Sequence, residues 1–256
     1  MNIEPRAGPE WNWPGSALAI LACVYCLVRR RRMDWQALWL TIRLAVLVAA
    51  VLLVLGLPIA YWIAYSRRRW RFLVEAMVAL PIVLPPTVLG FYVLVALGSR
   101  SPLGRWWQAM TGHTLAFTFG GLVIGSIIYS LPFAVQPFAA SFKLVDSRLI
   151  AASATLGASR LQTFARVILP LSLPGLVTGI ALSFAHTMGE FGVVLMVGGN
   201  IPGITKTVSI DIYDKVQALD YAGANETALV LLLISFAVLS LVYGVNRKVG
   251  VAWPWK

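Results

Sequence analysis

The sequence predicts an all-α integral membrane protein with five, or with an extra N-terminal segment six, membrane-spanning helices. Of its 256 residues, 59% are hydrophobic and only 12% are charged, and the mean hydropathy is +0.79. An ordinary soluble domain carries about 25% charged residues. The chain has no long polar stretch from which to build a soluble domain, so a single membrane domain accounts for it.

Five uncharged apolar stretches are long enough to cross a bilayer core, which takes about 20 residues of helix. They cover residues 44–66, 76–99, 114–142, 167–189 and 227–246. Most of them contain proline, which a helix bundle tolerates because neighbouring helices can satisfy the freed carbonyls. We therefore expect kinked helices.

The basic residues between these stretches predict the orientation. Eleven fall on one side, namely Arg67, Arg68, Arg69, Arg71, Lys143, Arg148, Arg160, Arg166, Arg247, Lys248 and Lys256, and four on the other, namely Arg100, Arg105, Lys206 and Lys215. The richer side faces the cytoplasm. The chain from Met33 onward then starts outside, crosses five times and ends inside. The net charge of +11 thus reflects topology and contact with lipid, and nucleic acid is not an expected partner.

Residues 1–33 form an N-terminal extension with a short apolar segment at 16–28, followed by four arginines at 29–32. A signal peptide would carry its charges before the apolar core and would show a cleavage site. A sixth span would place four arginines outside. An extra helix and a misassigned start upstream of Met33 both remain open. Cys23 and Cys26 are read as helix residues, because no second pair supports a redox or metal site.

The polar stretch 141–163 has the features of a docking element made of one or two short helices. Gly157 breaks it, and its small residues are Ala151, Ala152, Ser153, Ala154, Ala158 and Ser159. Small residues let a helix approach another surface closely, and the neighbouring basic residues keep the stretch on the cytoplasmic face. The alternative, an ordinary connecting loop, is seldom so long and alanine-rich.

This stretch resembles the EAA loop of ABC-importer membrane subunits, whose pattern is E-A-A-x-x-x-G-x9-I-x-L-P. Gly157, Leu169 and Pro170 stand at the family's spacing, while Ala151 replaces the Glu and Val167 the Ile. In that family the loop is a coupling helix that docks on an ATP-binding subunit. The resemblance implies an ATPase partner that engages residues 141–170. The coupling residues it implies are Ala151, Ala152, Ser153, Gly157, Leu169 and Pro170.

The resemblance continues from Asp34 to Lys248, since residues 80–90, 189–192 and 199–207 are similar to segments of molybdate and sulfate permeases. The last segment, with Ile212-Tyr213 after it, is similar to the molybdate type. The resemblance implies a type I ABC-importer permease in the cell (inner) membrane, with a transmembrane domain at 34–250 and a tail at 251–256. It also implies a second copy of the chain, two ATP-binding subunits and an extracytoplasmic molybdate-binding protein. Sulfate or tungstate is the alternative cargo.

Glu190 is the only acidic residue near the middle of the apolar mass. Burying a carboxylate in a bilayer costs several kcal/mol unless it is paired or neutralised. His186 lies four residues earlier, on the same face of a helix, so we expect a His186–Glu190 pair at the pathway or gate. The alternative places Glu190 near the outer interface, in contact with water. Direct contact with substrate is not expected, because a carboxylate repels an oxyanion.

A path for a dianion is expected to use backbone N–H groups, hydroxyls and helix N-termini, since a deep cationic site would bind too tightly. The hydroxyl candidates are Thr87, Ser126, Ser130, Thr178, Ser183 and Thr187, and packing is the alternative role for each. The pathway or gate candidates are Pro85, Pro86, Thr87, His186, Glu190 and Asn200.

Catalysis by this chain is not expected. Its two histidines, His113 and His186, are far apart, carboxylates are few, and no G-x-x-x-x-G-K-[ST] run is present. We therefore predict no catalytic residue, no metal and no cofactor. A secondary anion transporter is the rival function, because broken helices suit one. The docking-like loop and the lack of a detectable inverted repeat favour the ATP-driven importer.

Overall fold

A computed structural model describes residues 33–252, and from Asp34 onward these residues form one compact unit. The interpretations of residues 1–32, including both cysteines, lie outside the described residues. The longer helices are α2 (Trp35–Tyr65), α6 (Phe119–Lys143), α10 (Leu173–Gly189) and α13 (Tyr221–Ala252). The shorter helices are α3 (Arg71–Val83), α4 (Pro86–Leu97), α5 (Pro102–Thr111), α7 (Ser147–Thr155), α8 (Arg160–Thr163), α9 (Leu169–Leu171), α11 (Gly192–Gly198) and α12 (Val208–Gln217), with a π-helical turn η1 (Phe164–Ile168).

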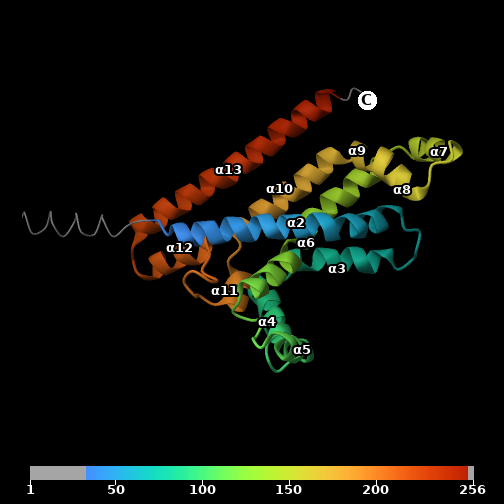
Figure 1. The fold of residues 1–256 in the computed structure, drawn as a ribbon. Coiled ribbons are helices and arrows are strands. Elements are labelled where there is room, and N and C mark those ends of the chain that lie inside the picture. Colours follow the sequence, from blue (N-terminus) through green and yellow to red (C-terminus); the bar gives the residue numbers. More distant parts are fainter. Residues whose placement is uncertain (1–32, 253–256) are drawn as a thin grey trace, which may run out of the picture. The chain divides into compact units, whose positions relative to one another are not determined.

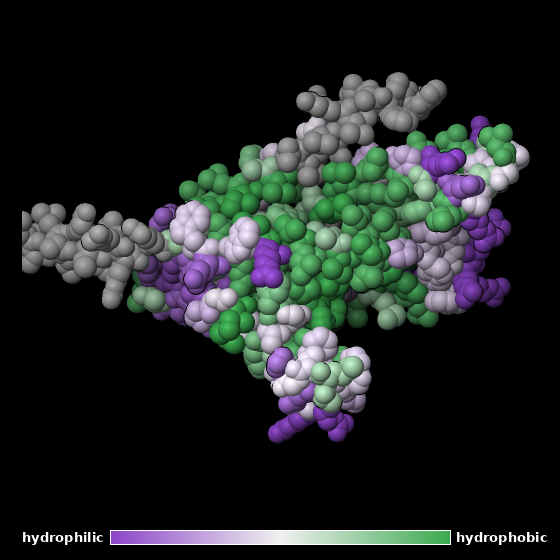
Figure 2. Space-filling model, in the orientation of Figure 1, coloured by the Kyte–Doolittle hydropathy of each residue, from purple (hydrophilic) through white to green (hydrophobic). Residues whose placement is uncertain are grey.

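Three of these helices are each long and apolar enough to span a membrane: α2, α6 and the Tyr221–Ser240 part of α13. Two bent pairs pass the same test, α3 with α4 at 111° and Arg160–Leu171 with α10 at 72°. If each bent pair is one span, the five predicted spans are all present. On the face shown in Figure 2, hydrophobic side chains cover most of the middle, while hydrophilic ones gather at the two ends and around α5.

The first span begins nine residues earlier than the predicted start at residue 44. Asp34 caps α2 by accepting hydrogen bonds from the backbone N–H groups of Gln36 and Ala37, at 3.0 Å each. Arg43 therefore lies within the helix, with its guanidinium 5.0 Å from the centroid of the Phe119 ring. The prediction was wrong here because it required an uncharged stretch. An exposed arginine can instead keep its stem on apolar surface and direct its charge toward the membrane interface.

The core lies where α2, α6 and α10 pack together, around the fully buried side chains of Phe138 and Phe142. Helices in a bilayer associate through close packing rather than through the hydrophobic effect. Gly179 of α10 permits this packing, since a Cβ there would lie 2.6 Å from Cε1 of Phe138 on α6. Helices α7 and α8 lie at the end of this bundle opposite α12 (Figure 1). By the charge rule, the α7–α8 end is cytoplasmic.

Candidate functional site

The docking element forms two short, well-capped helices at the cytoplasmic end. The Asp146 carboxylate accepts from the backbone N–H of Arg148 at 2.8 Å and begins α7, none of whose residues is buried. A capping box between Ser159 and Gln162 begins α8. Capping satisfies backbone donors that a short exposed helix would otherwise leave to water. The two helices thus keep their shape although Thr163 is the one buried residue between them.

Gly157 separates the two helices with a backbone φ of +78°, a left-handed conformation that other residues adopt at a cost. A Cβ at this position would meet no atom within 4 Å, so the backbone conformation, and not space, calls for glycine. A hydrogen bond of 2.9 Å between the Ser153 and Thr163 hydroxyls joins α7 to α8. Leu156 and Leu161, on either side of the turn, are 87% and 75% exposed.

The predicted coupling residues fall into two groups. Ala151 and Ala152 are exposed on α7 and Ser153 is half-buried there. Leu169 and Pro170 lie instead in α9, after the π turn, where the loop rejoins the membrane-spanning α10. The first group lies on the surface that a partner could contact, and the second connects that surface to the bundle.

Four of the six pathway candidates, Pro85, Pro86, Thr87 and Glu190, lie at two helix breaks that meet. Pro85 caps α4 and Pro86 is its first residue, after a sharp bend from α3. On the other side, α10 ends at Gly189 and α11 begins at Gly192. A Cβ on Gly192 would lie 2.6 Å from the Pro86 Cβ and 3.4 Å from the Thr87 nitrogen. Residues about a hundred positions apart in sequence therefore form one junction within the bundle.

The expected His186–Glu190 pair is not formed. Glu190 is 4% exposed and follows the last helical residue, with extended backbone at φ −68° and ψ 135°. In the described part of the chain, neither carboxylate oxygen has a hydrogen-bond partner. Ser126 lies beside the carboxyl, but no hydrogen bond of ordinary geometry joins the two groups. The prediction was wrong because the four-residue spacing brings side chains together only while the helix continues.

His186 contacts α6 instead. Its Nδ1 lies 3.0 Å from the Ser130 hydroxyl, and its ring stacks on Phe133 with centroids 3.9 Å apart. The ring centroid of Tyr129, which is also on α6, lies 4.7 Å from that of His186. His186 therefore fixes α10 against α6. Phe133 and Tyr129 were not singled out in the sequence, because aromatic residues in an apolar helix give no signal of a histidine opposite them.

Most of the candidate hydroxyls are already engaged within the protein. Thr178, Ser183 and Thr187 each donate to the carbonyl four residues earlier in α10, at 2.7–2.8 Å. Ser130 bonds to Thr187 at 2.9 Å. Such bonds satisfy the hydroxyl inside an apolar helix. Thr87, which is exposed in the first turn of α4, is the candidate that the structure leaves most open to solvent.

Asn200 lies apart from the junction, at the opposite end of α11, in a charged network that the sequence analysis missed. Its amide donates to both carboxylate oxygens of Asp214, at 2.9 and 2.8 Å. Lys206 forms ion pairs with Asp211 at 3.0 Å and Asp214 at 3.3 Å, and Lys215 pairs with Asp211 at 2.6 Å. The four-residue spacing of Asp211 and Lys215 was the available signal. This network braces the loop of residues 200–206 against α12.

The pKa of Lys206 reflects that network. Burial alone would lower the pKa, but hydrogen bonds with Asp211 and Asp214 and their negative charges outweigh burial, so the pKa is raised above its ordinary value of 10.5. The stabilisation from Lys206 is therefore complete below pH 10.5 and is lost as the pH rises through the folded-state pKa.

Comparison with known proteins places the chain in a family. Residues 56–251 match the family described as binding-protein-dependent transport system inner membrane component. The chain is 49% identical over 220 residues to the molybdenum transport system permease protein ModB of Azotobacter vinelandii. The matched region covers 86% of this chain and 97% of that relative. It is 34% identical to ModB of Escherichia coli K12, over 80% of this chain and 88% of the relative.

A solved structure shares the fold. The inward-facing MetNI methionine ABC transporter superposes with a TM-score of 0.69 at 17% identity, covering 85% of this chain and 96% of the solved one. The predicted type I permease architecture is thus confirmed. The family match and the similarity to transport permeases show that the chain is a transport subunit rather than an enzyme. An ATP-binding subunit and an extracytoplasmic binding protein are the partners that this kind of subunit implies. The chain belongs to the family of inner membrane components of binding-protein-dependent transport systems.

Proposed function

We propose that this chain is the membrane-spanning subunit of an ATP-driven molybdate importer, in which two copies form the pathway. The assignment of molybdate as the cargo rests on the 49% identity to a molybdenum permease, which extends over 97% of that relative. The resemblance of residues 199–207 to the molybdate type points the same way. Sulfate and tungstate are the competing cargoes.

Coupling to ATP is assigned to α7 and α8. Both helices are capped, the apolar side chains of Leu156 and Leu161 beside the Gly157 turn are exposed, and Thr163 is the one buried residue among the two helices. A pair of ATP-binding subunits that draw together on binding ATP would move these helices. Leu169 and Pro170 would pass the movement to α10, because they lie where the loop becomes that helix.

The junction of the two helix breaks is the proposed gate. Pro86 and Thr87 at the start of α4 contact the start of α11 at Gly192, so a tilt of α10 changes that contact directly. Pro85 and Glu190 lie in the two breaks themselves. His186 and Asn200 are assigned supporting roles, because their polar groups bond to Ser130 and Asp214.

Competitive uptake tests the cargo. Vesicles containing the chain with its ATP-binding subunit and binding protein are given labelled molybdate and an excess of unlabelled molybdate, tungstate or sulfate. Unlabelled molybdate should abolish the labelled signal at concentrations where sulfate has little effect. Equal competition by sulfate would overturn the molybdate assignment while leaving the importer assignment intact.

A further inference from the structure

The cytoplasmic end of α2 is surrounded by four neighbouring cavities whose linings overlap. We propose that it is a binding site for one anionic phospholipid, with the headgroup phosphate between Arg67 and Arg160 and the acyl chains in two apolar grooves beside Pro58. This site is separate from the transport junction, and it adjoins α7 and α8, which contribute Ile150, Ala154 and Arg160 to its lining.

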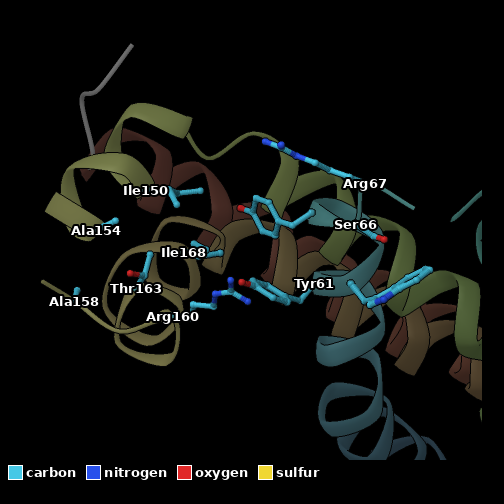
Figure 3. A pocket seen from close by; sticks show the side chains of 11 residues that line it. Tyr61, Ser66, Arg67, Ile150, Ala154, Ala158, Arg160, Thr163 and Ile168 are labelled. Carbon is cyan, nitrogen blue, oxygen red and sulfur yellow. The ribbon is translucent and has the colours of Figure 1, made fainter. Parts of the chain in front are cut away.

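The headgroup cavity, of about 610 Å³, lies between α2 and the α7–α8 loop. Figure 3 shows Arg67, which follows the end of α2, along one side of the cavity and Arg160 of α8 on the other side, with the Arg160 guanidinium near the Tyr61 ring. Ser66 and Thr163 add hydroxyl groups to the lining. Two guanidinium groups facing one space from separate elements suit a phosphate, which accepts forked hydrogen bonds from arginine.

Two apolar grooves continue from this cavity. One, of about 390 Å³, shares Tyr61 and Arg160 with it and is lined further by Leu57, Leu161 and Phe164. The other, of about 350 Å³, shares Trp62 with it and is lined further by Ile59, Trp70 and Val74. Pro58 borders both grooves. It lies seven residues before the end of α2, so the grooves reach about 10 Å from the headgroup level into the hydrocarbon region.

The charge at this end favours an anion. A further cavity, lined by Arg67, Arg68, Arg69 and Arg71, adjoins the first. Arg71 and Lys143 share the Glu75 carboxylate at 3.4 Å each, but within the described residues no carboxylate forms an ion pair with Arg67 or Arg160. Trp62 and Trp70, with ring centroids 4.9 Å apart, mark the level of the membrane interface. Basic pockets at that level on the cytoplasmic side suit anionic lipid headgroups.

A diacyl lipid accounts for the grooves as well as for the arginines, whereas a free phosphate or another soluble anion would use only the arginines. The test is a titration of the purified full chain in detergent with palmitoyl-oleoyl phosphatidylglycerol or the matching phosphatidylcholine, with bound lipid counted by native mass spectrometry. Phosphatidylglycerol should bind about tenfold more tightly, since each nearby arginine contributes a few-fold.

Matched variants locate the site. The double variant Arg67→Gln with Arg160→Gln should lose the preference, and the Lys double variant should keep part of it. The control is Arg148→Gln with Arg166→Gln, which removes the same charge from two exposed arginines outside these cavities and should keep the preference. Val74→Trp, which fills one groove, should weaken phosphatidylglycerol binding several-fold. Because this variant keeps both arginines, it tests the site even if the Gln double variant does not fold.

Three results would overturn the proposal. Equal binding of the two lipids would remove the headgroup site. An equal loss in the control variant would show that only net charge matters. Displacement of phosphatidylglycerol by millimolar inorganic phosphate, with no effect of Val74→Trp, would show a site for soluble anions instead.

Discussion

At the scale of single residues, Glu190 and Asp211 are two buried carboxylates in contrasting surroundings. Asp211 forms ion pairs with Lys206 and Lys215, whereas Glu190 has no hydrogen-bond partner among the described residues. A buried charge without a partner is costly, and one with partners becomes costly only when a partner is removed. The two groups should therefore respond in opposite ways to neutralisation.

Replacing Glu190 by Gln should not destabilise the chain, because the amide keeps the shape and removes a buried charge. The thermal midpoint of the purified protein should equal or exceed that of the wild type, and the order of preference among oxyanions in uptake should be unchanged. A midpoint several degrees lower would reveal a charged partner for Glu190.

Replacing Asp211 by Asn should cost about 3–5 kcal/mol of unfolding free energy, since it leaves two lysines around a neutral group. The control is Asp214→Asn, whose side chain is 34% exposed against 5% for Asp211 and which should cost about 1 kcal/mol or less. Chemical unfolding in detergent compares the two variants. Equal losses would refute the bracing role given to Asp211.

At the scale of elements, the spans were predictable and their meeting points were not. Hydropathy and prolines located five apolar segments and the break at Pro85-Pro86. They did not give the bend of 111° between α3 and α4, because the direction of α4 depends on its packing against α11, through Gly90 and Gly192. The predicted His186–Glu190 pair was wrong for a related reason. Because α10 ends at Gly189, the side chain of Glu190 no longer shares a helix face with His186.

The junction of the helix breaks can be tested with one methyl group. Gly192→Ala would place its Cβ 2.6 Å from that of Pro86, and overpacking of this kind costs about 1–3 kcal/mol. Gly189→Ala is the control, because a Cβ there meets no atom within 4 Å. We expect reduced uptake and a lower thermal midpoint for the first variant alone. Identical behaviour of the two would show that α4 and α11 do not need this close contact.

The turn between α7 and α8 makes a different demand. Because Gly157 has open space but a positive φ, Gly157→Val should uncouple ATP hydrolysis from uptake without preventing membrane insertion, at a local cost of about 1–3 kcal/mol. Gly157→Asn should be tolerated, since asparagine adopts this conformation more readily. Normal coupling in the Val variant, measured as ATP hydrolysed per oxyanion imported, would exclude α7 and α8 from the coupling step.

At the scale of the whole molecule, the chain is one subunit of a transport complex. Its membrane belt, its capped helices on the cytoplasmic face and the match of residues 56–251 to the permease family fit a subunit that moves when separate ATP-binding subunits move it. The rival account, a secondary anion transporter, needs no such partner and draws its energy from an ion gradient. The two accounts differ in what powers uptake.

The deciding measurement is molybdate uptake into vesicles that contain the chain and its ATP-binding subunit, with binding protein outside and ATP enclosed. Uptake should require hydrolysable ATP and should persist when ionophores collapse the ion gradients. Uptake that continues without ATP and stops when the gradients collapse would contradict the account.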